Sequence, residues 1–509
     1  MVKRIGLLVT LVGSAAAQQN RISPPRIWDD KALAEWATPI AALGVRPRHF
    51  TAAEYYAAPL DNLRTYPVYR PDREPPGYWE WLRKQKPLPL VDASKLRTRE
   101  DWMKAGESAF RALDEVWRRT SDPDRILSAR DVKAYEGVWT YPDGTLPRLR
   151  WVVTPEGVQL TLSACAVCHS LGRPDGNVFW GAPGTGIPPT ALRDPSGRGL
   201  GMIRSLAVPA LLTSPAFLFQ GDSPQLESWR SYTVPWAPDP RIERLRGGSE
   251  AEDRELRRSA GAPAIGVIGR IHGSPYYPAK TPDLTGLRYS RYIDATGTHR
   301  LRGPEDVARY AAFVSGADPM EFGEYRILKP EQRRVPFRYA DEVLYAIGVY
   351  LMALDAPRNP NPAPAAVIER GCQVFTRETC VNCHVPPNFT NAKLTLAEGY
   401  TPPADHPYHP DIVNVSVGTD PGLATKTRKG TGFYKIPSLR GVWYRPLLLH
   451  DGSVANLEEM FDPNRLRPDH EPGGWKGPGV TNRAIAGHPF GLGLNPEDKD
   501  ALLAFLRSL

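Results

Sequence analysis

The sequence is poor in cysteine, and beyond residue 17 it has no apolar run of about 18 residues, the length that a membrane-spanning helix needs. We therefore expect no membrane span in the mature protein. The glycine-rich stretches WGAPGTGIPP and SGRGLGM follow no clear strand and lack the Lys-Ser/Thr pair of a phosphate-binding loop, so we expect no nucleotide site. Of the 5 cysteines in 509 residues, Cys372 stands apart from the others. We expect it to be a small buried residue and not a reactive thiol.

The other four cysteines form two copies of one pattern, C-x-x-C-H. The copies are Cys165, Cys168 and His169, and Cys380, Cys383 and His384. This pattern is the attachment signal of c-type haem, because the two thiols reach both vinyl groups and the next imidazole turns onto the iron. A zinc site usually needs further ligands at its own spacing, and a thioredoxin-like dithiol does not require the histidine. The motifs therefore predict two covalently bound haem c groups, with His169 and His384 as proximal iron ligands.

Residues 1–17 have the pattern of a cleaved secretory signal. Lys3 and Arg4 precede the apolar run IGLLVTLVG, three alanines follow, and we expect maturation near Gln18. Bacteria attach c-type haem outside the cytoplasm, so we predict a periplasmic or otherwise exported protein. The formal net charge of +8 includes the two signal residues, and four haem propionates would offset more of it. We expect a redox partner protein or a small electron donor as the partner, and no nucleic acid.

The 53 prolines and 44 glycines are many for a helical protein, so we expect long loops between the helices. Turn signals at 142–144 and 155–157, flanked by apolar runs, predict a small β-hairpin before Cys165. Capping residues and apolar spacing predict helices over 98–119, 304–314, 340–354 and 496–509, and one from Ala365 towards Cys380.

The clearest linker is PRNPNPAP, since consecutive prolines stop a helix and keep the backbone extended. The predicted fold class is mainly α, with two cytochrome c-like modules and long loops, the first module being enlarged by irregular insertions and the small β-hairpin. The expected divisions are a signal peptide at 1–17, an irregular wrapping segment at 18–95, the first module at 96–356, the linker at 357–364 and the second module at 365–509.

Beyond the haem motifs, the two halves also carry similar short sequence patterns in the same order. Each half places I-x-S-L before G-x-x-x-[QN]-L-E, at 203–227 and again at 436–458. The closing helices also match: Glu342, Ala346, Tyr350, Leu351 and Leu354 correspond to Glu497, Ala501, Phe505, Leu506 and Leu509. This pattern predicts a repeated module with insertions in the first copy.

The stretch from Tyr434 to Glu459, YKIPSLRGVWYRPLLLHDGSVANLEE, resembles the signature of the bacterial dihaem cytochrome c peroxidase superfamily, which includes a maturation enzyme acting on tryptophan and the rubber oxygenases. The resemblance is closest over residues 365–509. It implies two cytochrome c modules, in which a low-spin haem handles electrons and the other haem does chemistry. Where the peroxidases usually carry F-W-D-G-R after the first haem, this chain has LFQGD at 218–222 and lacks that tryptophan.

The resemblance also indicates a second ligand for one iron. His488, in GHPFG, resembles the G-H-x-[FY]-G element that carries the distal histidine in rubber-oxygenase-like relatives. We prefer it to Met460 and His450 for the second haem. Two histidines would give that iron a lower potential than a His/Met pair. For the first iron, His299 matches the position of His488 under one alignment of the two halves and not under the other, and His272 is a further candidate.

These observations leave three hypotheses of function. In the first, the chain is a redox enzyme that transfers electrons and uses peroxide or dioxygen at an open first haem. In the second, it is a pure dihaem electron carrier with both irons six-coordinate. A third and weaker hypothesis is an oxygenase of an apolar substrate, from the rubber-oxygenase-like C-terminus and the 13 tryptophans. The sequence leaves the catalytic residues, the substrate, the electron donor and the oligomeric state open.

Overall fold

The computed structural model describes residues 24–135, 139–184, 233–243, 267–268, 276–427 and 429–509. The helices in these ranges are α1 (Asp30–Ala34), α2 (Ala52–Tyr56), α3 (Tyr78–Leu82), α4 (Arg99–Ala112), α5 (Pro123–Ser128), α9 (Pro240–Glu243), α11 (Pro304–Val314), α12 (Asp341–Ala353), α13 (Ala365–Arg377), α14 (Gly422–Lys426), α15 (Leu457–Met460) and α16 (Pro496–Ser508). The expected signal peptide, the 203–227 repeat, the LFQGD stretch and His272 lie outside the described residues.

The strands are short, apart from one pair that forms the predicted hairpin. They are β1 (Leu60–Asp61), β2 (Thr65–Tyr69), β3 (Thr145–Thr154), β4 (Gly157–Leu162), β5 (Ser170–Gly172), β6 (Val178–Trp180), β7 (Val267–Ile268), β8 (Ala279–Lys280), β9 (Tyr292–Ile293), β10 (His299–Arg300), β11 (Glu321–Phe322), β12 (Tyr325–Arg326), β13 (Arg338–Tyr339), β14 (Leu394–Leu396), β15 (Ile412–Ser416) and β16 (Phe433–Lys435). No helix in the described ranges has the length and apolar character required to cross a bilayer.

The long helices lie where capping and apolar spacing predict them. Helices α11, α12 and α16 have bounds within one residue of the expected ones, and α13 begins at Ala365 as expected and ends at Arg377. Thr98 caps α4 as expected: its Oγ1 accepts from the Asp101 amide at 3.1 Å, and the Asp101 carboxylate accepts from the Thr98 amide at 2.8 Å. The prediction that this helix runs to residue 119 is wrong, because it ends at Ala112. Glu115 instead donates its amide to the Leu162 carbonyl at 3.0 Å and so extends along the edge of β4.

In each half, two helices cross closely at a glycine: α4 with α12 in the first half, and α13 with α16 in the second. A Cβ on Gly106 of α4 would overlap the carbonyl of Ala346 on α12, and a Cβ on Gly371 of α13 would overlap the carbonyl of Ala501 on α16. Ala346 and Ala501 are equivalent positions in the predicted repeat. The crossings therefore support the alignment in which α12, and not α11, is the counterpart of α16.

The predicted hairpin is part of a larger sheet. Strands β3 and β4 pair antiparallel around the turn at 155–157, and β2 pairs with the other edge of β3. Strand β2 lies in the segment 18–95, which we expected to be an irregular wrapping segment and which also contains the short helices α1, α2 and α3. A second sheet, in the order β15-β14-β16, was not predicted.

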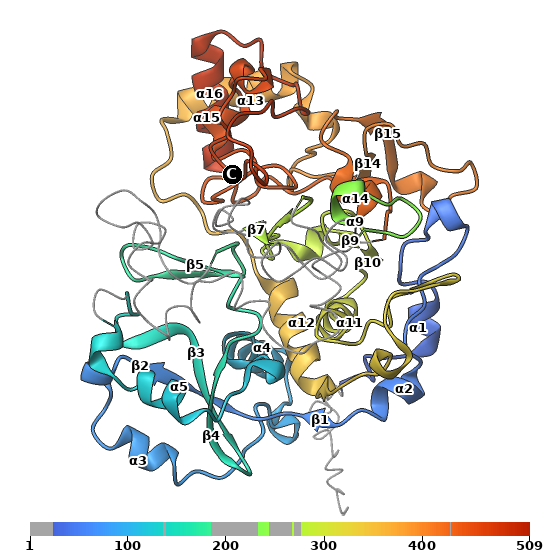
Figure 1. Cartoon of the computed structure of the whole chain (residues 1–509). Helices are drawn as coiled ribbons and strands as arrows, with labels where there is room; N and C mark the ends of the chain where they lie inside the picture. Colours follow the sequence, from blue (N-terminus) through green and yellow to red (C-terminus); the bar gives the residue numbers. More distant parts are fainter. Residues whose placement is uncertain (1–23, 136–138, 185–232, 244–266, 269–275, 428) are drawn as a thin grey trace, which may run out of the picture.

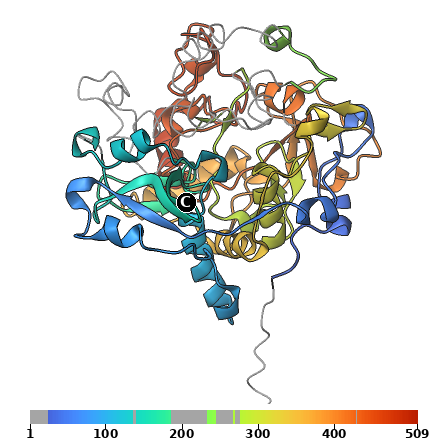
Figure 2. The same cartoon turned by 60° about the horizontal axis from the view of Figure 1, so that its bottom comes forward.

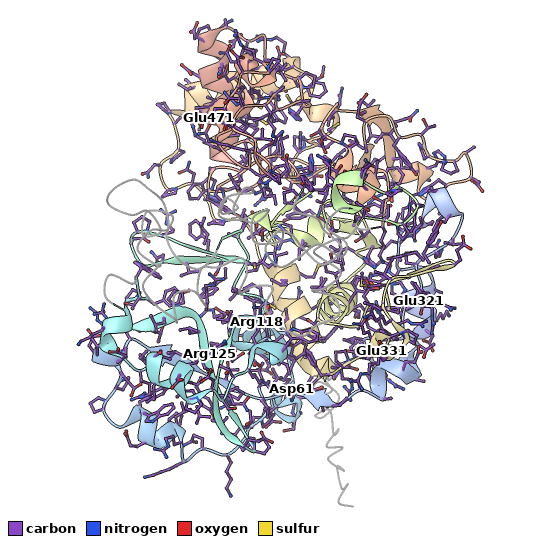
Figure 3. All side chains as sticks on the ribbon, viewed as in Figure 1. Asp61, Arg118, Arg125, Glu321, Glu331 and Glu471 are labelled. Carbon is purple, nitrogen blue, oxygen red and sulfur yellow. The ribbon has the colours of Figure 1, made fainter. Side chains whose placement is uncertain are left out.

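The molecule has two main apolar cores. One contains residues of α4, α11 and α12, and the other contains residues of α13, α15 and α16. Figure 1 shows α13, α15 and α16 as one group, joined to α12 by the extended linker at 357–364, and Figure 2 shows the same groups from below. The N-terminal segment is held to the first half by ion pairs of Arg48 with Glu321 at 2.9 Å and of Arg119 with Asp61 at 2.7 Å. Figure 3 labels the acidic residue of each pair, Glu321 and Asp61.

Candidate functional site

The second C-x-x-C-H motif forms a single turn directly after α13. Thr379 ends the helical segment with a φ of 60°. The amides of Cys383 and His384 then donate to the Cys380 carbonyl, at 3.3 and 2.9 Å. This turn places two thiols and one imidazole on five consecutive residues next to the second apolar core.

His384 is oriented by a backbone carbonyl. Its Nδ1 lies 3.2 Å from the carbonyl oxygen of Phe389. With the proton on Nδ1, the lone pair is on Nε2, and a carbonyl partner of this kind fixes the ring of a metal-binding histidine. Burial lowers the pKa of His384 to about 4, and the Arg445 cation contributes to the shift. The imidazole is therefore neutral at pH 7, which is the form that binds a metal.

The ring of His488 faces the ring of His384. The ring centres are 6.5 Å apart and the ring planes meet at 49°. Metal–imidazole bonds are about 2 Å long, so two imidazoles on opposite sides of one iron have their centres about 6 Å apart. Burial also lowers the pKa of His488 to about 4, and its Nδ1 is buried without a hydrogen-bond partner. The spacing and the neutral rings fit a haem iron between the two histidines.

A buried arginine holds the loop that carries His488. His488 and Gly487 have positive φ values of 48° and 90°, so the loop needs an external anchor. The His488 amide donates to the Val417 carbonyl at 2.6 Å. Arg465, with 0% exposure, donates to the carbonyls of Ile485, Gly487 and His488 at 2.6 to 2.9 Å. No sequence signal pointed to Arg465.

The other two candidates for this position have different surroundings. Met460 is 7% exposed and packs in the apolar core of α13, α15 and α16. The ring of His450 lies on Tyr434, with centres 4.5 Å apart, and its Nδ1 is 3.3 Å from the hydroxyl of Thr419. Of the three candidates, all within the described residues, His488 is the one with a ring contact to His384.

The first motif makes the same turn after β4. The amide of His169 donates to the Cys165 carbonyl at 3.2 Å. Its Nδ1 lies 3.1 Å from the carbonyl oxygen of Pro282. As at the second motif, a backbone carbonyl meets Nδ1, so the Nε2 lone pair is the one that could bind a metal. Sequence reasoning missed Pro282 because it is 113 residues away along the chain.

The thiols of Cys165 and Cys380, one from each motif, are protonated at neutral pH. Burial raises the pKa of Cys165 to about 12, and the nearby Glu115 carboxylate adds to the shift. Burial also raises the pKa of Cys380 to about 11. A zinc site or a reactive dithiol uses thiolates, whose pKa values are lowered. Within the described ranges, no three His, Cys, Asp or Glu side chains converge as metal ligands would.

His299 lies in a buried polar cluster and not in an open position. It has 0% exposure, and its ring packs on Trp36 with centres 4.1 Å apart. Its Nε2 is 3.2 Å from Nζ of Lys429, and its Nδ1 is 2.9 Å from the hydroxyl of Thr298. Both ring nitrogens are therefore engaged, and the helix crossings favour the alignment in which His299 is not the counterpart of His488.

Sequence reasoning also missed Arg445. Its Nη1 donates to the Ser438 carbonyl at 2.7 Å, its Nη2 donates to the Arg440 carbonyl at 2.6 Å, and its Nε donates to the Asp283 carboxylate at 2.9 Å. An arginine inside the apolar run VWYRPLLL is the signal that could have found it, because a buried charge requires a built-in partner.

No family model and no curated protein matches this chain. Among solved structures, hydrazine synthase of Kuenenia stuttgartiensis, pressurised with xenon, is similar over 56% of this chain and 86% of its own, with 15% identity and a TM-score of 0.25. A MauG-like protein associated with microbial copper homeostasis is similar over 45% of this chain and 73% of its own, with 17% identity and a TM-score of 0.28. At these TM-scores the similarity carries no argument about function.

Proposed function

We propose that this chain is an exported dihaem c-type cytochrome that transfers electrons and acts as a redox enzyme, with peroxide or dioxygen as the substrate of the first haem. The observation that carries the proposal is the shared geometry of the two motifs. In each, the histidine amide donates to the carbonyl of the first cysteine, and the histidine Nδ1 meets a distant backbone carbonyl. This geometry leaves two thiols and one ligand nitrogen on the same turn.

Bound haem c supplies one-electron transfer and, at an iron with an open position, peroxide or dioxygen chemistry. The chain's own residues hold and orient it. His384 and His488 are neutral and face one another, which suits a six-coordinate, low-spin iron. His169 keeps its Nδ1 proton on the Pro282 carbonyl, which makes its Nε2 a stronger electron donor.

The partner and compartment follow from the cofactor and the N-terminal sequence. An apolar run after Lys3 and Arg4 supports export, which agrees with covalent haem attachment. A redox partner protein or a small electron donor would reduce the haems.

A pure electron carrier is the alternative, and the two functions differ at the first iron. We would count haems in the purified protein, made in a host with haem-attachment machinery, and record the low-temperature electron paramagnetic resonance spectrum of the ferric form. We expect two haems per chain, one low-spin and one high-spin. Two low-spin signals would favour the carrier, and fewer than two covalent haems would refute the proposal.

Substitutions assign the two signals. His488→Ala should convert the low-spin haem to high spin, because it removes one axial imidazole while both thiols remain. The exposed His409→Ala is the matched control and should leave both signals unchanged. A low-spin signal that persists in His488→Ala would move the assignment to another ligand.

A further inference from the structure

The segment 279–285 connects the first haem motif to the second half of the molecule. At one end, the Lys280 amide donates to the carbonyl of His450 at 2.7 Å. At the other end, the Leu284 amide donates to Gly181 at 2.8 Å, close behind the first motif. Between these points, the Pro282 carbonyl accepts from His169 Nδ1. Three residues of chain, 280–282, therefore pass from the second half of the molecule to the proximal histidine of the first.

Asp283, the next residue, connects this segment to the second half. Its Oδ2 accepts from the Tyr444 hydroxyl at 2.7 Å and from Arg445 Nε at 2.9 Å. Its Oδ1 accepts from the amide and hydroxyl of Thr285 at 2.9 and 2.8 Å. The side chains of Asp283 and Arg445 are only 6% and 7% exposed. A buried carboxylate with this many partners holds the Pro282 carbonyl in a fixed position.

Arg445 continues the connection to the second motif. Its guanidinium holds the Ser438 carbonyl at 2.7 Å. The next residue, Leu439, donates its amide at 3.2 Å to the Phe389 carbonyl, the same oxygen that faces His384 Nδ1. A continuous series of hydrogen bonds and short chain segments thus runs from one proximal histidine to the other, through the Asp283–Arg445 ion pair.

Asp283 also carries a negative charge close to the cations of Lys280 and Arg445. Burial lowers the pKa of Lys280 to about 8, with Arg445 and Lys435 adding to the shift and Asp283 opposing it. Burial lowers the pKa of Lys435 as well, and Arg445 contributes. Removing the charge of Asp283 would leave Lys280 without the anion that opposes its pKa shift, and Arg445 without the carboxylate that it contacts. Excess positive charge favours the ferrous over the ferric state of a nearby haem.

We propose that Asp283 is a positioning residue that couples the two haem sites and lowers the reduction potential of both. It holds the carbonyl that orients His169, and it balances the arginine that holds the loop beside His384. This inference rests on the proposed function, because it requires both motifs to carry haem.

The test is a redox titration of the holoprotein, followed by visible absorption and electron paramagnetic resonance, for wild type and Asp283→Asn. We expect the ferrous/ferric ratio at a fixed potential to rise about tenfold at both haems, which is about 59 mV for a one-electron couple. Asp411→Asn is the matched control, because Asp411 also accepts from an arginine and a tyrosine, Arg291 at 2.6 Å and Tyr292 at 2.7 Å. It should leave both potentials unchanged.

Arg445→Gln gives a second test with the opposite sign. Removing the cation should lower both potentials, and the double variant Asp283→Asn/Arg445→Gln should return them towards wild type. The inference is overturned if, at a fixed potential, the ferrous/ferric ratios of both haems in a two-haem Asp283→Asn protein stay within twofold of wild type. It is also overturned if Asp411→Asn shifts these ratios as much as Asp283→Asn does. Should Asp283→Asn fail to fold, unchanged potentials in Arg445→Gln would overturn it. A wild-type chain with fewer than two haems would instead refute the proposed function.

Discussion

At the scale of single residues, backbone carbonyls orient the groups that matter most. The carbonyls of Pro282 and Phe389 meet the Nδ1 atoms of His169 and His384, and the carbonyl of His488 itself is held by Arg465. A carbonyl is defined by the path of the chain and not by residue type. Its position therefore depends on the side chains that fix that path, and these side chains are the sensitive points of the site.

Arg465 is the first such point. Replacing it with Met would remove the donor that anchors the His488 loop and leave buried carbonyls unsatisfied. We expect the free energy of unfolding to fall by about 2 to 4 kcal/mol. We also expect the second haem to lose part of its low-spin signal, while the haem count and the signal of the first haem stay unchanged.

Arg467→Met is the control for this experiment. Arg467 lies two residues away and forms an exposed ion pair with Asp469 at 2.9 Å. Its loss should change the free energy of unfolding by less than about 0.5 kcal/mol. Denaturant unfolding and electron paramagnetic resonance of both variants provide the comparison. A wild-type low-spin signal in Arg465→Met would show that the loop keeps its position without the arginine.

At the scale of elements, the glycine crossings give each half its central helix pair. Gly→Ala in a helix normally stabilises by about 1 kcal/mol. At Gly371 the added methyl would overlap the Ala501 carbonyl and the Cβ of Phe505, so α13 and α16 would have to separate. We expect Gly371→Ala to lower the free energy of unfolding by about 1 to 3 kcal/mol, and Gly106→Ala to do the same in the first half.

Denaturant unfolding monitored by circular dichroism measures this effect. Gln373→Ala, at an exposed position of the same helix, is the control and should be neutral within about 0.5 kcal/mol. A Gly371→Ala protein as stable as wild type would mean that the two helices do not meet as closely as the crossing requires.

The same elements show what the sequence could predict. Helices α11, α12, α13 and α16 follow from local signals, because caps and apolar spacing lie within each segment. The end of α4 does not, since Glu115 leaves the helix to bond with Leu162, 47 residues later. Strand β2 and the sheet of β14, β15 and β16 also depend on partners that are distant in sequence.

The candidate site divides in the same way. The cysteines and proximal histidines are contiguous, so their motif was visible in the sequence, and His488 lay in a short element that resembles a known one. Arg465, Pro282 and Asp283 act through contacts with distant parts of the chain. Nothing in their local sequence indicates those contacts.

At the scale of the whole molecule, the two halves meet through the segment that follows the second motif. The Thr431 hydroxyl donates to the Thr296 carbonyl at 2.7 Å, and the Lys435 amide donates to the Ala295 carbonyl at 2.8 Å. Lys429, in the same segment, is 2% exposed and reaches the buried His299. The second half therefore places a cation inside the first.

The surroundings of Lys429 determine how it responds to pH. Its Nζ lies 3.2 Å from His299 Nε2 and 4.7 Å from the centre of the Phe313 ring. Burial lowers the pKa of Lys429 from 10.5 to about 8, although the carboxylates of Asp318 and Asp294 oppose the shift. Folding therefore moves the Lys429 ammonium group from water into a buried site that favours the neutral amine.

The consequence is a stability that rises with pH. Between about pH 8 and 10.5, the unfolded chain keeps a proton on Lys429 that the folded chain has lost, so the free energy of unfolding increases by up to about 1.4 kcal/mol per pH unit. We expect the free energy of unfolding of Lys429→Met to lack this rise with pH. The variant should be more stable than wild type at pH 7, and the difference between the two should narrow as the pH rises. Lys280 keeps its own pH dependence in both proteins, so the difference isolates Lys429.

Denaturant unfolding at pH 7, 8, 9 and 10 measures this difference. Lys426→Met is the control, because that side chain is 37% exposed and should leave the slope as it is in wild type. If the free energies of unfolding of Lys429→Met and wild type depended on pH in the same way, the burial of Lys429 would not destabilise its charged form in the folded state. In that case the contact between Lys429 and His299 would not place a buried positive charge between the two halves.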